Sequence, residues 1–211
     1  MPLEVIPAIL VKERSELLRR IAAVSPHVKT VHIDVMDNVF VPNKTVGPES
    51  FAGLPENVAY EFHWMVANPE SYIAKMPGPH LHMVHFEAVK DWDAVEAAVK
   101  KAGGELGIAF NPATPAEKIA PLANRAKRIL AMTVVPGFDG QRYIPEVERK
   151  IKELRSRFPS IEIEVDGGIN AETGARAAKA GADKLAAASA IFSAPDKAKA
   201  IDAIKKGGGG V

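Results

Sequence analysis

The sequence contains no cysteine among its 211 residues, which excludes disulfides, thiolate metal ligands and cysteine nucleophiles. Its net charge is only +1, so it lacks the field that attracts nucleic acid or an anionic membrane surface. No apolar run approaches the roughly 18–20 residues of a membrane span. The N-terminus also lacks a basic segment followed by an apolar signal core. We therefore expect a cytoplasmic protein that binds neither nucleic acid nor membranes.

What the chain does contain is a regular alternation of apolar runs and amphipathic segments. The apolar, strand-like runs cover residues 3–10, 28–35, 58–66, 80–87, 105–110, 128–134, 161–165 and 183–187. Strict strand–helix alternation predicts a parallel sheet with right-handed crossovers, and eight such units at this length predict a closed (β/α)8 TIM barrel in the α/β class. An open doubly wound sheet is the main alternative, but no glycine-rich turn follows the first run.

The domain organisation follows from the same pattern. Neither a composition shift nor a tandem repeat divides the chain, so residues 1–205 are predicted to form a single barrel domain. The last predicted helix spans residues 195–205. Residues 206–211 are mostly glycine and are expected to form a disordered tail.

Two histidines and two aspartates stand at the ends of predicted strands. His32 and Asp34 are two residues apart in one run, so their side chains share a face; His63 and Asp166 end the third and seventh runs. Active sites of such barrels lie at the carboxyl ends of the strands, and all four residues fall there. Each alone could be an isolated hydrogen-bonded group, but together they predict a site for one divalent ion, Zn²⁺, Fe²⁺, Mn²⁺ or Co²⁺.

Three turns at the same end of the barrel suit a phosphate group. They contain Gly137, Phe138, Asp139 and Gly140 after the sixth run, Gly167 and Gly168 after the seventh, and Ala188 and Ser189 after the eighth. Many barrels bind phosphate at the last two strands through backbone N–H groups, and glycine allows a close approach. Any one of these could be an ordinary turn, but their shared position favours phosphate binding.

Other strand-end residues complete the predicted pocket. Met36, Met65 and Met132 each end a strand and are expected to form an apolar cap above a reacting carbon, with ordinary core packing as the alternative. In the fourth run, His85 has the opposite parity to His80 and His82, so only one of these sets can face the barrel interior. We expect it to be His85, next to Glu87.

The motifs together resemble the ribulose-phosphate 3-epimerase family. They are HIDVMD (32–37), FVPN (40–43), HWM (63–65), HFE (85–87), NPATP (111–115), MTV (132–134), PGF (136–138), GQ (140–141) and EVDGG (164–168). They follow one another in family order and spacing from about Pro7 to Pro195. The resemblance implies a (β/α)8 barrel that interconverts D-ribulose 5-phosphate and D-xylulose 5-phosphate in the pentose phosphate pathway. It also implies a homo-oligomer, either a dimer or a hexamer.

The resemblance assigns roles to the candidate residues. The divalent metal would be held by His32, Asp34, His63 and Asp166, with Asp34 and Asp166 as the paired acid and base and His63 also near the substrate. Inverting a carbon beside a carbonyl needs two such groups on opposite faces. The metal would supply positive charge to the developing enediolate.

Four positions depart from the family pattern. Ala8 replaces a usual serine, and Asn38, Asp139 and Ala188 replace usual glycines. A carboxylate at Asp139 would repel a phosphate. Two alternatives therefore stay open: a related 3-epimerase of a ketohexose 6-phosphate such as allulose 6-phosphate, and a sugar-phosphate-binding barrel with weak or no catalysis.

Overall fold

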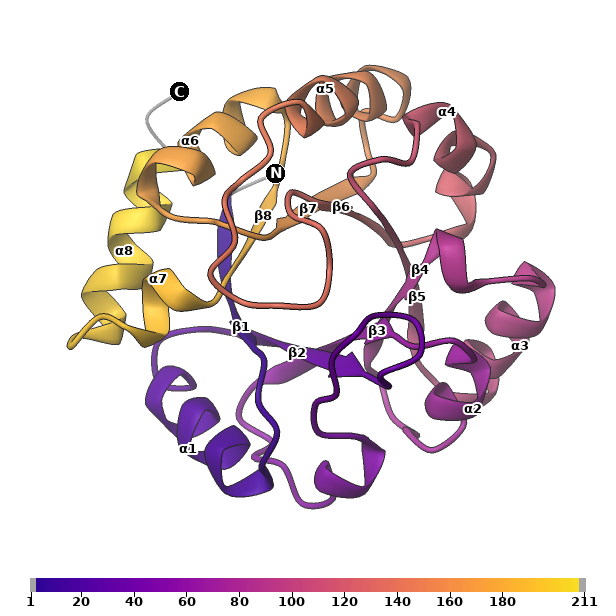
Figure 1. Ribbon diagram of the computed structural model, residues 1–211, viewed down its shortest axis with the longest axis horizontal. Coiled ribbons are helices and arrows are strands. Elements are labelled where there is room, and N and C mark those ends of the chain that lie inside the picture. Colours follow the sequence, from indigo (N-terminus) through magenta and orange to yellow (C-terminus); the bar gives the residue numbers. More distant parts are fainter. Residues whose placement is uncertain (1–2, 209–211) are drawn as a thin grey trace.

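The computed structural model describes residues 3–208 and shows a closed barrel of eight parallel strands in sequence order (Figure 1). The strands are β1 (Glu4–Ile9), β2 (Thr30–Met36), β3 (Ala59–Met65), β4 (Leu81–His85), β5 (Glu105–Phe110), β6 (Arg128–Met132), β7 (Glu162–Asp166) and β8 (Lys184–Ala187). The predicted TIM barrel is therefore confirmed. All eight strand runs were placed correctly, with differences of a few residues at their ends.

Helices surround the barrel. They are α1 (Arg14–Val24), α2 (Pro69–Ile73), α3 (Trp92–Ala102), α4 (Ala116–Ile119), α5 (Val147–Arg157), α6 (Ala171–Ala180), α7 (Ser189–Phe192) and α8 (Lys197–Gly208), with 3-10 turns at Pro48–Ser50, Phe86–Ala88 and Ala120–Arg125. The best-defined start is that of α6, where the Asn170 side chain accepts hydrogen bonds from the backbone N–H groups of Glu172 and Thr173.

Two local expectations need correction. The segment after β8 was expected to be only a turn, but Ser189–Phe192 form the short helix α7. Residues 206–208, expected to be disordered, continue helix α8. Gly208 is buried, and a Cβ at this position would lie 2.5 Å from Leu3 Cδ2 and 3.4 Å from the Cβ of Ala178 in α6. Packing against Leu3 and α6 therefore outweighs the low helix propensity of glycine. Residues 209–211 lie outside the described part of the chain.

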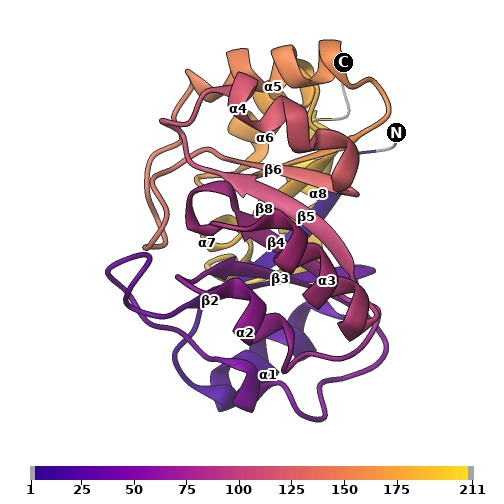
Figure 2. The same cartoon turned by 90° about the vertical axis from the view of Figure 1, so that its right-hand side faces the viewer.

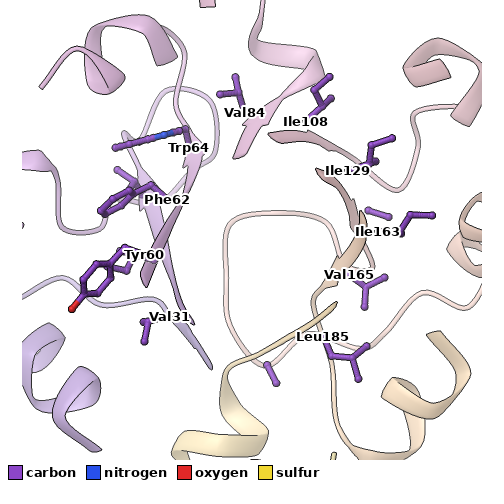
Figure 3. Packing of buried hydrophobic residues seen from close by; sticks show 14 of the residues in the cluster. Val31, Tyr60, Phe62, Trp64, Val84, Ile108, Ile129, Ile163, Val165 and Leu185 are labelled. Carbon is purple, nitrogen blue, oxygen red and sulfur yellow. The ribbon is translucent and has the colours of Figure 1, made fainter. Parts of the chain in front are cut away.

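The outer faces of the strands form the main hydrophobic core. The labelled side chains of Phe62, Trp64, Ile129 and Leu185 point away from the barrel axis toward the surrounding helices (Figure 3). Since side chains alternate along a strand, the remaining residues of each strand point into the barrel. The charged residues of β2, β3, β6 and β7 belong to this inward set.

The lower part of the barrel interior is a buried ionic network. The Arg128 guanidinium forms ion pairs with Glu61 and with Glu164, the latter at 2.7 Å between Nη1 and Oε2. Both carboxylates also contact His32 Nδ1, Glu61 at 2.7 Å and Glu164 at 3.2 Å. Nearer the amino ends of the strands, Lys184 pairs with Glu4 and Glu162. Buried carboxylates are tolerated when paired in this way.

Two long loops mark the carboxyl end of the barrel. The loop after β2 (residues 37–47) and the loop after β6 (residues 133–146) both project from the same end, at the left of Figure 2. They form the rim above the site described below.

We predict that Arg128→Met destabilises the fold by about 3–5 kcal/mol, because it leaves Glu61 and Glu164 buried without their shared cation. Urea unfolding followed by circular dichroism measures this change. Arg125→Met is the matched control, since Arg125 also pairs with two acids but at the surface, and its effect should be much smaller. Equal effects of the two variants would contradict a stabilising role for the interior network.

Candidate active site

Strand register brings the four predicted ligands together. Asp34 of β2 lies beside His63 of β3, and β7 places Asp166 beside Met132 of β6. Asp34 Oδ1 is 2.9 Å from His63 Nδ1 and 3.3 Å from His32 Nε2, while Asp166 Oδ2 is 3.6 Å from His63 Nδ1. One ligand atom from each of the four residues lies within 4.8 Å of the others, and all four side chains are buried.

These distances fit a single divalent ion. Ligand atoms about 2.0–2.2 Å from a metal lie roughly 3–3.5 Å from one another. The His32 ring is also held in a suitable orientation, because its Nδ1 faces Glu61 and Glu164 while its Nε2 faces the site. The four residues therefore form a buried His/Asp group that could hold a divalent metal.

A second group of possible ligands, His32, Glu61 and Glu164, lies just below. The Arg128 guanidinium already pairs with both of its carboxylates. A divalent ion there would be repelled by this cation, so the lower group fits a metal poorly.

The two aspartates have opposite electrostatic environments. Burial would raise the pKa of Asp34, but hydrogen bonds from His32 and His63 outweigh it and hold that pKa well below its usual range. Burial and then the charge of Asp34 raise the pKa of Asp166 well above its usual range. Burial also lowers the pKa of His63 to about 4. The charge of one aspartate thus depends on the charge of the other.

A pocket opens above these residues at the carboxyl end of the strands. Its lining includes Asp34, Met36, Met65, Met132, Gly137, Phe138, Asp139, Gly140, Asp166, Gly167, Gly168, Ala188 and Ser189. The predicted aspartates, methionines and turn residues therefore all line the pocket, whereas the predicted histidines His32, His63 and His85 do not. His32 and His63 are fully buried beneath it.

The three methionines both line the pocket and pack against one another or the core. Met36 lies beside Met65 in the β2–β3 register, and both pack with Val41. Met132 belongs to the inner cluster with Leu130 and Val134. The three methionines therefore line the pocket and also pack in the core, so the two alternatives considered for them are both present.

The predicted phosphate end is built from backbone. Gly168 has a φ of +65°, and a Cβ there would lie 2.7 Å from the Tyr143 nitrogen, so this position requires glycine. Within residues 3–208, the N–H groups of Gly168 and Ser189 have no hydrogen-bond acceptor. Ala188 has a φ of −104°, so its replacement of glycine causes no left-handed strain. Asn38, with a φ of +62°, adopts the left-handed conformation that asparagine tolerates.

Asp139 changes this end of the pocket. Its carboxylate accepts a hydrogen bond of 2.6 Å from the N–H of Gly140. The side chain is exposed, and its charge also contributes to raising the pKa of Asp166, after burial and the charges of nearer groups. Aspartate in place of the usual glycine therefore adds negative charge to the pocket and occupies the N–H of Gly140.

Sequence reasoning placed His85 correctly in the interior, where its Nε2 lies 2.8 Å from His63 Nε2. It missed Glu61, Glu164 and Arg128. A signal was present, because Glu61 and Glu164 each stand two residues before a predicted ligand and so share its inward face. Arg128, four residues before Met132, follows the same alternation.

Comparison with known proteins agrees with this geometry. Residues 4–192 match the model of the ribulose-phosphate 3-epimerase family. The chain belongs to this family of isomerases. It is 38% identical over 184 residues to "Ribulose-phosphate 3-epimerase, cytoplasmic isoform" of Oryza sativa subsp. japonica, covering 83% of this chain and 81% of the relative. It is 35% identical over 212 residues to ribulose-phosphate 3-epimerase of Mycobacterium tuberculosis, covering 96% and 92%.

Solved structures with little sequence similarity share the barrel. The 3-hexulose-6-phosphate synthase of Salmonella typhimurium superposes with a TM-score of 0.71 at 18% identity, covering 98% of each chain. Orotidine 5'-phosphate decarboxylase of Pyrococcus horikoshii OT3 gives 0.68 at 21% identity, covering 98% of this chain and 100% of that one. At these identities the likeness concerns the fold alone.

We predict that saturating Zn²⁺, Mn²⁺ or Co²⁺ raises the melting temperature of chelator-treated protein by roughly 5–10 °C. This follows from about 2.7 kcal/mol of stabilisation at a hundred times the dissociation constant. Differential scanning fluorimetry gives the measurement. Asp34→Ala should lose most of the increase, because Asp34 Oδ1 contacts both histidines. An unchanged melting temperature with all three ions would contradict the metal site.

Proposed function

We propose that this protein is a metal-dependent ribulose-phosphate 3-epimerase, which interconverts D-ribulose 5-phosphate and D-xylulose 5-phosphate. The observation that carries the proposal is the meeting of two carboxylates, Asp34 from β2 and Asp166 from β7, in one pocket, with ligand atoms within 4.8 Å of each other. Figure 1 shows that β2 and β7 are not neighbouring strands of the barrel. The names of the relatives support the same reaction.

In this proposal Asp34 and Asp166 are the two proton-transfer groups. One, as carboxylate, removes the proton from C3 on one face of the substrate, and the resulting charge is delocalised onto the neighbouring carbonyl as an enediolate. The other, as carboxylic acid, returns a proton to C3 on the opposite face, which inverts the carbon. The reverse reaction exchanges their roles.

The residues around the two aspartates serve this chemistry. A divalent ion, Zn²⁺, Fe²⁺, Mn²⁺ or Co²⁺, held by His32, Asp34, His63 and Asp166, would supply positive charge to the enediolate. Met36, Met65 and Met132 would cover the reacting carbon. Because a thioether has no exchangeable proton, they exclude water without offering a competing acid.

The sugar-phosphate end is proposed to lie against the three turns. The N–H groups of Gly168 and Ser189 would bind the phosphate, and Gly137, Phe138, Gly140, Gly167 and Ala188 would form the surrounding backbone. His63 would act from beneath, through the metal site, because its side chain is fully buried.

We extend the proposal to the setting of the enzyme. It would act in the cytoplasm in the pentose phosphate pathway, as a single barrel domain and as a homo-oligomer, a dimer or a hexamer. The name of the rice relative as a cytoplasmic isoform supports this location. In residues 3–208, no helix has the length and hydropathy needed to cross a membrane.

The proposal is tested by a coupled assay for xylulose 5-phosphate formed from ribulose 5-phosphate, before and after chelator treatment and after metal is restored. Turnover that disappears with chelation and returns with metal is expected. Turnover of allulose 6-phosphate in place of the pentulose would move the assignment to a ketohexose-phosphate epimerase. Metal binding without turnover of either would favour a barrel that only binds its ligand.

We predict that Asp34→Asn and Asp166→Asn each lower kcat by at least about a thousandfold, because each removes one of the two groups that exchange a proton with C3. Circular dichroism should show that both variants remain folded. Asp196→Asn, a change at an exposed carboxylate, is the control and should leave kcat unchanged. Turnover near the normal rate in either pocket variant would rule out the two-base mechanism.

We predict that Asp139→Gly tightens binding of ribulose 5-phosphate by about fivefold, since two unit charges a few ångströms apart in water interact by about 1 kcal/mol. Isothermal titration with the substrate measures this affinity. Asp139→Asn separates the effect of the charge from that of the hydrogen bond to Gly140. It removes the charge but retains an oxygen that can accept from the Gly140 N–H. Unchanged affinity in both variants would mean that Asp139 does not act on the phosphate.

A further inference from the structure

Two side chains behind His63 form a continuous hydrogen-bonded row with it. His63 Nε2 lies 2.8 Å from His85 Nε2, and His85 Nδ1 lies 3.3 Å from Glu87 Oε2. Both imidazoles are fully buried, and the Phe40 ring packs on His85 at 5.0 Å between ring centroids. The row begins at the proposed metal site and ends at a carboxylate on the turn after β4.

The far end of the row has a fixed polarity. Glu87 Oε1 accepts a hydrogen bond of 2.9 Å from the backbone N–H of Asn111 and another from the hydroxyl of Thr114. Burial would raise the pKa of Glu87, but the hydrogen bonds from His85, Thr114 and Asn111 outweigh it and lower the pKa to about 2. Glu87 is therefore a carboxylate at neutral pH, and its Oε2 can only accept.

Because Glu87 accepts at one end, the direction of each hydrogen bond in the row is fixed as far as the proposed metal site. Because Glu87 Oε2 can only accept, the neutral His85 ring carries its proton on Nδ1 and presents a lone pair at Nε2. His63 Nε2 then donates to that lone pair. A neutral imidazole has one donor and one acceptor nitrogen, so His63 Nδ1 is left with a lone pair facing Asp34 and the site.

The alternative arrangement would block metal binding. His63 Nδ1 can give a proton to Asp34 or a lone pair to a metal, but not both. With nothing to accept from Nε2, the nearby Asp34 carboxylate would favour the proton on Nδ1. We propose that His85 and Glu87 are positioning residues that keep the proton of His63 on Nε2 and thereby preserve Nδ1 as a metal ligand.

This inference rests on the proposed metal-dependent function, but it concerns residues that touch neither metal nor substrate. Glu87→Gln tests it with little change in shape. The fixed Asn111 N–H keeps the amide oxygen on its own side, which turns the amide NH₂ toward His85 Nδ1. His85 would then carry its proton on Nε2, and the direction of every hydrogen bond in the row would reverse.

The matched control is Thr114→Val. It removes the other side-chain hydrogen bond to the same carboxylate while leaving Glu87 an acceptor toward His85. Both variants change the hydrogen bonding of the same side chain, but only Glu87→Gln reverses the row. A purely structural role for Glu87 would make the two variants behave alike.

The first measurement is the Co²⁺ dissociation constant of chelator-treated protein, followed through the absorption of the bound ion. Glu87→Gln should weaken Co²⁺ binding by about 10- to 100-fold, the usual cost of losing a residue that orients a metal ligand. Thr114→Val should change it by less than about threefold. Equal affinities of the Glu87→Gln and unmodified proteins would overturn the proposal.

The second measurement is independent of the metal. Long-range ¹H–¹⁵N NMR spectra of the metal-free protein report which nitrogen of His63 is protonated. Glu87→Gln should shift His63 toward the Nδ1–H form relative to the unmodified protein, whereas an identical tautomer in both proteins would refute the inference. If the unmodified protein bound no Co²⁺, the proposed function would fail, while this comparison would still decide the role of Glu87.

If Glu87→Gln does not fold, His85→Phe provides the same test. Phenylalanine retains a ring of similar size against Phe40 but offers His63 no acceptor. Co²⁺ binding should again weaken by at least tenfold, and undiminished affinity would contradict the proposal.

Discussion

Charge buried inside a closed barrel requires compensation, and this requirement organises the centre of the molecule. In the lower layer, Arg128 and Lys184 neutralise the glutamates of β1, β3 and β7. In the upper layer, Asp34 and Asp166 lie with two histidines, and no lysine or arginine lines the pocket formed by the described residues. A divalent ion would supply positive charge directly to the two aspartates of the upper layer.

The two layers are connected through the imidazole of His32. His32 contacts the glutamates below through one nitrogen and Asp34 above through the other. His63 does not reach the lower layer; it contacts Asp34 through one nitrogen and His85 through the other. Each of the two histidine ligands is therefore oriented by a buried neighbour, and its position depends on the barrel interior rather than on one loop.

Much of this arrangement could be predicted from strand periodicity. Alternation within β2 and β3 was enough to place His32, Asp34 and His63 on the inner face, and the ends of the strands placed Asp166 on the same rim. The Arg128 network could not be predicted in the same way, because it joins β3, β6 and β7 and depends on a register between strands far apart in the sequence. The predicted end of α8 was wrong because packing of Gly208 against Leu3 and α6, rather than local propensity, decides where the helix ends.

The phosphate end shows the limit of reading residues one at a time. Ala188 stands where the family usually has a glycine, but its φ of −104° is not left-handed, and helix α7 follows it directly. Asp139 also replaces a glycine, and it alters the pocket by occupying the Gly140 N–H and adding a charge. The sequence could identify both positions, but only the backbone angles and contacts show how the two replacements differ.

Proton NMR of the reaction in D₂O shows directly whether two carboxylates act on opposite faces of C3. The two-base mechanism predicts that product formed by the unmodified enzyme carries solvent deuterium at C3. It also predicts that at least one of the variants Asp34→Asn and Asp166→Asn still exchanges the C3 proton of one epimer without inverting it, since one base remains. Product that retains the original proton at C3 would contradict the two-base mechanism.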